Sequence, residues 1–152
     1  MRPPLVLAPL LLAASLAQAG EGEKSALSVL FVGHDPAAPH VSFPDMATER
    51  THELYAERTP AFEAFLNEHF EEVRVVHGAD YRPYQSEAFD VTIFDTMPPA
   101  LTEAGWQTDP ETGEQTYTQA VYLPEEFDLP ALLIGEASPR IGEGLGLKLD
   151  WL

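Results

Sequence analysis

The sequence predicts an α/β domain built on a parallel β-sheet. Two short apolar runs, at residues 27–33 and 131–134, have the composition of strands that are buried on both faces, as in a parallel sheet. Strand-like segments alternate with a helical segment along the chain, and this alternation is typical of βαβ units. The length of 152 residues corresponds to one domain.

The N-terminal residues have the features of a secretory signal peptide. Arg2 gives a basic start, residues 5–16 are apolar, and Ala-Gln-Ala at 17–19 is a small-x-small cleavage site. We therefore expect a signal peptide at 1–19, the α/β domain at 20–152, and a secreted or periplasmic protein. An uncleaved anchor helix is the alternative, although the apolar stretch is short for a membrane span.

The chain is strongly acidic, with a formal net charge of −17 at pH 7. A surface of this sign repels nucleic acid and anionic membranes, so we expect neither as a partner. Solubility explains the excess of carboxylates, and attraction of cations is the alternative. The sequence holds no cysteine, which excludes disulfide bonds, a lipoprotein anchor and catalysis by a thiolate.

The first half of the domain is predicted to form a strand, a helix and a second strand. Residues 27–33 are the first strand, and residues 72–77 are the second. Thr59 and Pro60 indicate a helix start, with threonine as the N-cap and proline at the first helical position. Residues 47–57 are expected to hold a helical turn or two.

The second half is predicted to add two parallel strands and an inserted β-hairpin. Residues 89–95 are the third strand, and residues 131–134 are the next parallel one. Between them, Asp-Pro-Glu-Thr-Gly at 109–113 separates two β-prone stretches, which predicts the hairpin, with an irregular loop as the alternative. Ser138 is expected to cap a short helix, with Pro139 at its first position.

The last residues have the pattern of a further strand. From position 145 onwards, apolar residues alternate with polar or small ones at Leu145, Leu147, Leu149 and Trp151. Glycines at 142, 144 and 146 disfavour a helix here, and we expect them to follow the short helix. Because the chain stops inside this apolar pattern, we expect either a C-terminally truncated domain or a minimal sheet.

Three segments carry a family resemblance: residues 30–34 (Leu-Phe-Val-Gly-His), 58–66 (Arg-Thr-Pro-Ala-Phe-Glu-Ala-Phe-Leu) and 89–95 (Phe-Asp-Val-Thr-Ile-Phe-Asp). They resemble the class I glutamine amidotransferase-like superfamily, and within it the trehalose-utilisation (ThuA-like) proteins. The resemblance covers residues 27–95 and, more loosely, 129–152. It implies a flavodoxin-like, three-layer α/β/α sandwich and a link to carbohydrate metabolism.

The resemblance also shows which part of the family's chemistry this chain lacks. Amidotransferase members use a cysteine in the turn after a central strand, together with a distant histidine and glutamate. By position that turn is 135–137 here, and it carries Glu136 but no cysteine. Family members also continue past the point where this chain ends. The resemblance therefore implies a ligand-binding or degenerate domain.

Four side chains are predicted to lie at strand carboxyl ends, and they form the candidate catalytic site: His34, Asp35, Asp95 and Glu136. In a parallel sheet these ends share one edge, so the side chains can converge on one cleft. Such a set can bind a divalent metal or divide acid and base roles. The alternative is that each side chain caps nearby backbone.

Other polar residues are expected to have structural roles. Roles in stabilising the fold are expected for His69, His77 and Ser138, and a surface ion pair is expected for Arg140. A second polar cluster occupies the long connection after the first strand, with spacings that match no standard metal motif, so a solvated loop or lid is expected. Besides His34 and Asp35, its members are His40, Asp45, Glu49 and His52.

Three functions remain as hypotheses. The first is a secreted ThuA-like domain that binds a small molecule, such as a sugar derivative, without the catalytic cysteine. The second is a metal- or carboxylate-dependent hydrolase that acts on a sugar derivative through the four strand-end residues. The third is an interaction module whose exposed last strand pairs with a partner. The sequence leaves catalysis open, and a divalent metal is the one cofactor considered.

Overall fold

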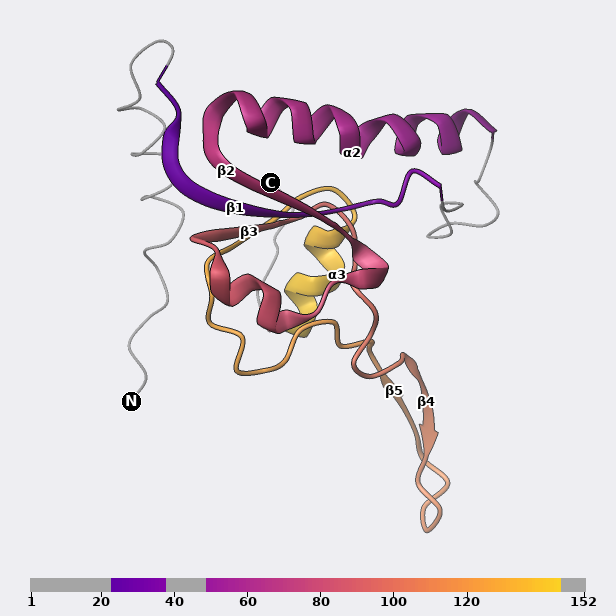
Figure 1. Ribbon diagram of the computed structural model, residues 1–152. Helices are drawn as coiled ribbons and strands as arrows, with labels where there is room; N and C mark the ends of the chain where they lie inside the picture. Colours follow the sequence, from indigo (N-terminus) through magenta and orange to yellow (C-terminus); the bar gives the residue numbers. More distant parts are fainter. Residues whose placement is uncertain (1–22, 38–48, 146–152) are drawn as a thin grey trace, which may run out of the picture.

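The computed structural model describes residues 23–37 and 49–145, and it contains a four-stranded parallel sheet in the order β2-β1-β3-β6 (Figure 1). The strands are β1 (Ser25–Gly33), β2 (Phe70–His77), β3 (Val91–Phe94) and β6 (Ala131–Leu133). The predicted α/β class with a parallel sheet is therefore confirmed. The predicted signal peptide lies outside the described residues. Within the described ranges, no helix combines the length and the apolar character that a membrane crossing requires.

The strand order places β1 at the centre of the sheet. Its Val29 pairs in parallel register with Val73 of β2 on one side and with Val91 of β3 on the other. The chain passes from β1 to β2 on one side of it, and later adds β3 and β6 on the other side. In open α/β sheets a crevice forms at the carboxyl ends where the order reverses in this way, which is here between β1 and β3.

The central strand is buried on both faces, because its side chains alternate between two apolar cores. Val29 and Phe31 belong to one core, which also contains Leu66. Leu30 and Val32 belong to the other. Burial of each such side chain contributes about 1.5–3 kcal/mol to folding. These cores fix the position of the strand end that carries His34.

One face of the sheet is covered by α2 (Glu49–His69), a single helix of 21 residues with Pro60 inside it (Figure 1). The predicted helix start at Thr59 is therefore wrong. The Thr59 hydroxyl donates a hydrogen bond to the carbonyl oxygen of His34 at 2.8 Å. An interior proline costs a helix about 3 kcal/mol. Tertiary contacts on either side offset this cost, including the stacking of Phe62 on Phe31 with ring centroids 5.3 Å apart.

The opposite face is covered by short helical segments, which are η2 (Gly78–Asp80), η3 (Pro83–Ala88) and α3 (Ala137–Gly144). The predicted cap at Ser138 is wrong, because α3 begins one residue earlier. Pro139 still falls in the first turn, where its missing N–H is not needed. The expectation that the glycines follow this helix is also wrong for Gly142 and Gly144. Ala137 and Ile141, one turn apart, are both buried, and their packing outweighs the low helix propensity of glycine.

The predicted final strand does not begin at Leu145. The backbone N–H of Leu145 donates to the carbonyl oxygen of Ile141 at 3.1 Å, a helix-type bond that continues the turn of α3. The burial of Ile141 holds this turn against the core. The remainder of the predicted strand, residues 146–152, lies outside the described residues.

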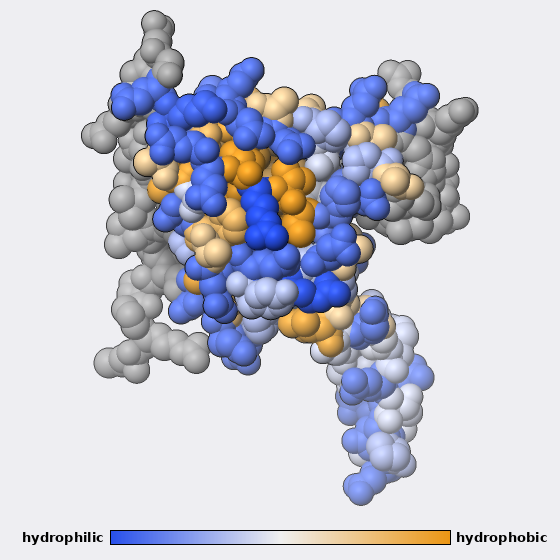
Figure 2. Space-filling model, viewed as in Figure 1, coloured by the Kyte–Doolittle hydropathy of each residue, from blue (hydrophilic) through white to orange (hydrophobic). Residues whose placement is uncertain are grey.

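The segment between β3 and β6 contains an antiparallel pair, β4 (Gly105–Thr108) and β5 (Gln115–Thr118), which extends away from the sheet (Figure 1). At the connecting turn, Asp109 Oδ1 accepts hydrogen bonds from the N–H groups of Glu111 and Thr112 at 2.8 and 2.9 Å. This side chain therefore fixes the turn. In the space-filling view, the projecting segment is hydrophilic over most of its surface (Figure 2).

Substitution of Gly33 can test how closely α2 packs on β1. In a Gly33→Ala variant the new Cβ would lie 2.6 Å from Thr59 Oγ1 and 2.8 Å from Phe31 Cε1. We predict a loss of about 1–3 kcal/mol in the free energy of unfolding, measured by urea denaturation, because neither group can move freely. Gly105→Ala is the matched control, since nothing lies within 4 Å of its added Cβ. Equal stability of the two variants would contradict this packing.

Candidate functional site

The structure brings together His34, which follows β1, and Glu136, which follows β6. His34 Nε2 lies 3.5 Å from Glu136 Oε1, and the two side chains are 9% and 14% exposed. The backbone carbonyl of His34 is held by the Thr59 hydroxyl of α2. A histidine and a glutamate from two different strand ends therefore share one nearly buried position at the carboxyl edge of the sheet.

Asp95, which directly follows β3, is held by Arg58 of α2. Arg58 Nε donates to Asp95 Oδ2 and Nη2 donates to Oδ1, both at 2.6 Å. The carboxylate is completely buried, whereas the arginine side chain is 38% exposed. The hydrogen bond to Asp95 is the main cause that raises the pKa of Arg58 above its ordinary value. Because Arg58 engages both carboxylate oxygens, Asp95 acts as an anchor for the guanidinium.

Arg58 is the residue that sequence reasoning missed. It stands directly before Thr59, which the sequence predicts to be the helix N-cap, so the local pattern does not predict a helix face that carries Arg58. Its position in the segment that carries the family resemblance is the one signal that could have identified it. In the structure Arg58 lies within α2 and faces the end of β3.

Asp35 does not join the other three predicted site residues. Its Oδ1 lies 3.7 Å from His77 Nδ1 at the end of β2, with both side chains more than a third exposed. The same oxygen accepts a hydrogen bond from the backbone N–H of Ala37 at 2.8 Å. Asp35 therefore stabilises its own turn and lies beside β2. The contact between His77 and Asp35 agrees with a structural role for that histidine.

Tyr55 connects α2 to the histidine. Its ring packs edge-on against the His34 ring, with centroids 4.5 Å apart and an interplanar angle of 62°. Burial is the main cause that raises the pKa of the Tyr55 hydroxyl, and the negative charges of Glu136 and Asp95 add to it against the opposing effect of Arg58. The pKa of Tyr55 therefore depends on the charges of Glu136 and of the Arg58–Asp95 pair.

Gly135 allows the turn that carries Glu136 to lie close to the Arg58–Asp95 pair. Its φ of +56° lies in the left-handed region, which glycine adopts without strain. A Cβ atom here would lie 3.3 Å from both Arg58 Nη2 and Asp95 Oδ1. The turn that carries Glu136 therefore passes directly against the Arg58–Asp95 pair, and the strand-end residues form one contiguous group.

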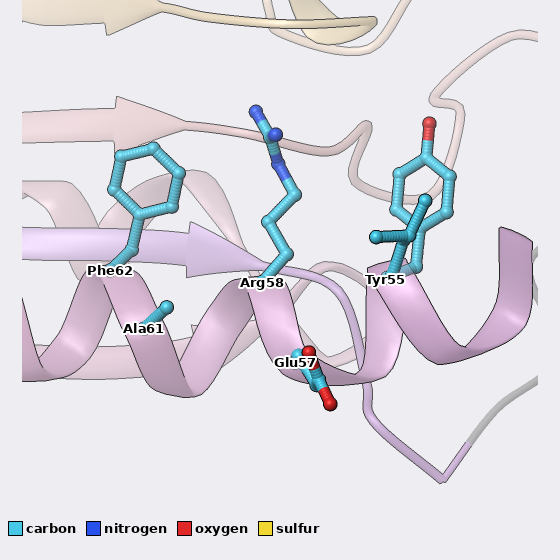
Figure 3. A pocket seen from close by; sticks show the side chains of 6 residues that line it. Tyr55, Glu57, Arg58, Ala61 and Phe62 are labelled. Atoms are coloured by element: carbon cyan, nitrogen blue, oxygen red, sulfur yellow. The ribbon is translucent and has the colours of Figure 1, made fainter. Parts of the chain in front are cut away.

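A cavity of about 510 Å³ adjoins this group along α2 (Figure 3). Arg58, Phe62 and Tyr55 extend from the helix in the same direction in this view. The guanidinium carbon of Arg58 lies 5.2 Å from the centre of the Phe62 ring, a distance at which the cation and the ring attract each other. The lining residues are Leu54, Tyr55, Glu57, Arg58, Ala61 and Phe62.

Arg58 retains donors for a ligand. Its Nε and Nη2 atoms bind Asp95, and among the described residues no hydrogen bond from Nη1 is present. Because the carboxylate and the ring of Phe62 hold the guanidinium, its remaining N–H groups are oriented before any ligand arrives. A ligand in the cavity therefore meets a fixed donor beside an apolar wall.

The described residues do not contain a metal-binding set. No group of three or more His, Asp or Glu side chains in residues 23–37 and 49–145 is placed to hold a metal ion. For the predicted loop cluster, His40 and Asp45 lie outside the described residues, and the side chains of Glu49 and His52 are not described either.

Comparisons with known proteins add no relative: no protein-family model, curated protein or solved structure matches this chain. The ThuA-like resemblance therefore remains a prediction from short motifs.

The Arg58–Asp95 pair can be tested through stability. We predict that Asp95→Asn lowers the free energy of unfolding by about 2 kcal/mol, because the amide leaves Arg58 without its counter-charge and replaces one acceptor oxygen by an NH₂ group. Breaking a fully buried pair costs roughly 3–5 kcal/mol, and the 38% exposure of Arg58 reduces the effect. Asp128→Asn, at an exposed aspartate, should change stability little. Equal urea midpoints for both variants would argue against a buried pair.

The electrostatic contact between Tyr55 and Glu136 predicts a measurable titration. The pKa of Tyr55 should lie above its ordinary value of 10.0, and Glu136→Gln should lower it because a nearby negative charge is removed. Carbon-13 NMR of labelled tyrosine measures this pKa, with Tyr55→Phe to assign the signal. Glu126→Gln, at an exposed position, should leave the titration unchanged. A Glu136→Gln variant with an unaltered Tyr55 titration would contradict the contact.

Proposed function

We propose that this protein is a small-molecule-binding domain whose site lies at the carboxyl edge of the parallel sheet. The observation that carries the proposal is the position of the strand-end group. His34 and Asp95 follow β1 and β3, the two strands between which the strand order reverses, and Glu136 lies beside them. Ligands of open α/β sheets bind at this place. The adjoining cavity provides room for a small molecule.

We further propose a flavodoxin-like, three-layer sandwich of the ThuA-like branch, with β4 and β5 as an inserted hairpin. The strand order β2-β1-β3-β6 agrees with this topology, and apolar cores on both faces of the sheet support three layers. Secretion through a signal peptide at 1–19 and a role in carbohydrate metabolism belong to the same proposal, and they are supported by the sequence motifs.

The pairing of the carboxylates favours binding over catalysis. Asp95 has both oxygens engaged by Arg58, and Asp35 pairs with His77 on the other side of β1. General acid–base catalysis needs a carboxyl group that reaches the substrate and exchanges a proton with it. A carboxylate that is buried and bidentate to arginine instead fixes its partner.

The ligand that fits this environment is a neutral polyhydroxyl compound, such as a sugar derivative. Arg58 and Asp95 compensate each other's charge, and Glu136 adds a negative one, so the site does not favour an anion. Hydroxyl groups of a sugar can accept from the Arg58 N–H groups, and the apolar wall at Leu54 and Ala61 can contact its C–H groups. This mixture of polar and apolar lining is typical of small-molecule sites.

A hydrolase acting on a sugar derivative is the second candidate, and the pairing of His34 with Glu136 favours it. A histidine and a carboxylate within 3.5 Å can divide acid and base roles. Hydrolysis of aryl glycosides or sugar esters that disappears in Glu136→Gln would support this candidate. Ligand binding without turnover would support the first.

A thermal-shift experiment tests the binding proposal. Trehalose and glucose should raise the melting temperature, whereas glucuronate should not, because Glu136 repels its carboxylate. A ligand at a hundred times its Kd adds about 2.7 kcal/mol to stability. Tyr55→Phe and Glu136→Gln should reduce the shift, and Glu126→Gln should retain it. The proposal fails if no neutral sugar shifts the wild type, or if all three variants respond alike.

A further inference from the structure

The β4–β5 ribbon, defined as residues 105–118, exposes an aromatic pair far from the candidate site. Trp106 and Tyr117 face each other across the two strands, with ring centroids 5.2 Å apart. They are 68% and 50% exposed. Large aromatic side chains supply much of the binding energy at protein interfaces, so a pair left exposed on a projecting element indicates a contact surface.

The charge around this pair is of one sign. Residues 101–120 contain four carboxylates and no lysine or arginine. All four are exposed, namely Glu103, Asp109, Glu111 and Glu114. Hydrogen bonds from the backbone of Thr112 and Glu111 lower the pKa of Asp109, which keeps the turn charged. The complementary surface is therefore cationic, and cations also bind the faces of tryptophan and tyrosine.

The ribbon also has open backbone edges. Within the described part of the chain, β4 and β5 pair only with each other, so the outer edge of each strand has N–H and C=O groups available. A two-stranded ribbon is marginally stable by itself, and a third strand stabilises it. An extended peptide can supply that strand through backbone hydrogen bonds.

We propose that the β4–β5 ribbon docks an extended, arginine- and lysine-rich segment of another protein. The segment adds a strand to the ribbon and places its cationic side chains against Trp106, Tyr117 and the surrounding carboxylates. A second copy of this chain does not fit, because its net charge of −17 opposes association. A sugar face does not fit either, since the two rings are inclined at 60° and offer no flat platform.

Isothermal titration of the full chain with a synthetic peptide of alternating arginine and threonine tests this proposal. Substituting both aromatics, as Trp106→Ala with Tyr117→Ala, should weaken binding about tenfold. The triple variant Glu103→Gln, Glu111→Gln, Glu114→Gln should have a similar effect. The matched control, Glu87→Gln with Glu125→Gln and Glu126→Gln, removes the same charge at exposed positions elsewhere and should bind within about twofold of wild type.

Three results would overturn the proposal. The first is no binding of the peptide to the wild type, and the second is unweakened binding by the aromatic variant. The third is an equal loss in the control triple variant, which would show a non-specific attraction to the acidic chain. If circular dichroism shows that the aromatic variant is unfolded, NMR of the wild type provides the test. The peptide should then shift the indole signal of Trp106, and an unchanged signal would contradict docking.

Discussion

The bidentate contact between Arg58 and Asp95 is the interaction on which the site depends. It joins the middle of α2 to the end of β3 through two charge-assisted hydrogen bonds of 2.6 Å from a partly exposed guanidinium to a buried carboxylate. The contact orients the guanidinium beside the cavity and fixes α2 one turn from Tyr55, which in turn packs on His34. The contact therefore joins the end of β3 to the same helix that contacts His34 at the end of β1.

The same contact explains why α2 is continuous through Pro60. A proline inside a helix removes a backbone hydrogen bond, so it persists only where surrounding contacts compensate. Arg58 lies on one side of it and Phe62, stacked on Phe31 of β1, on the other. The Thr59 hydroxyl, bonded to the carbonyl of His34, adds a third point of attachment. The site and the helix are therefore stabilised by one set of contacts.

The sequence predicts the strands well because burial on both faces leaves a continuous apolar run, as at residues 27–33. Its local helix signals fail where tertiary contacts dominate: Thr59 bonds to another element, and Gly142 lies in a helix held by buried Ile141. Strand-end position correctly brought His34 and Glu136 together. It could not assign the partner of Asp95, since Arg58 comes from a helix face whose orientation depends on packing rather than on local pattern.

The carboxylates of this acidic chain differ in whether they have partners within the fold. Those at the strand ends have partners within the fold: Asp95 is bound by the guanidinium of Arg58, and Asp35 lies beside His77. Those of the ribbon have no lysine or arginine anywhere in residues 101–120. Exposed carboxylates are sufficient to explain solubility, but solubility does not explain an exposed tryptophan in the same segment. The combination is explained when the compensating cation belongs to another molecule.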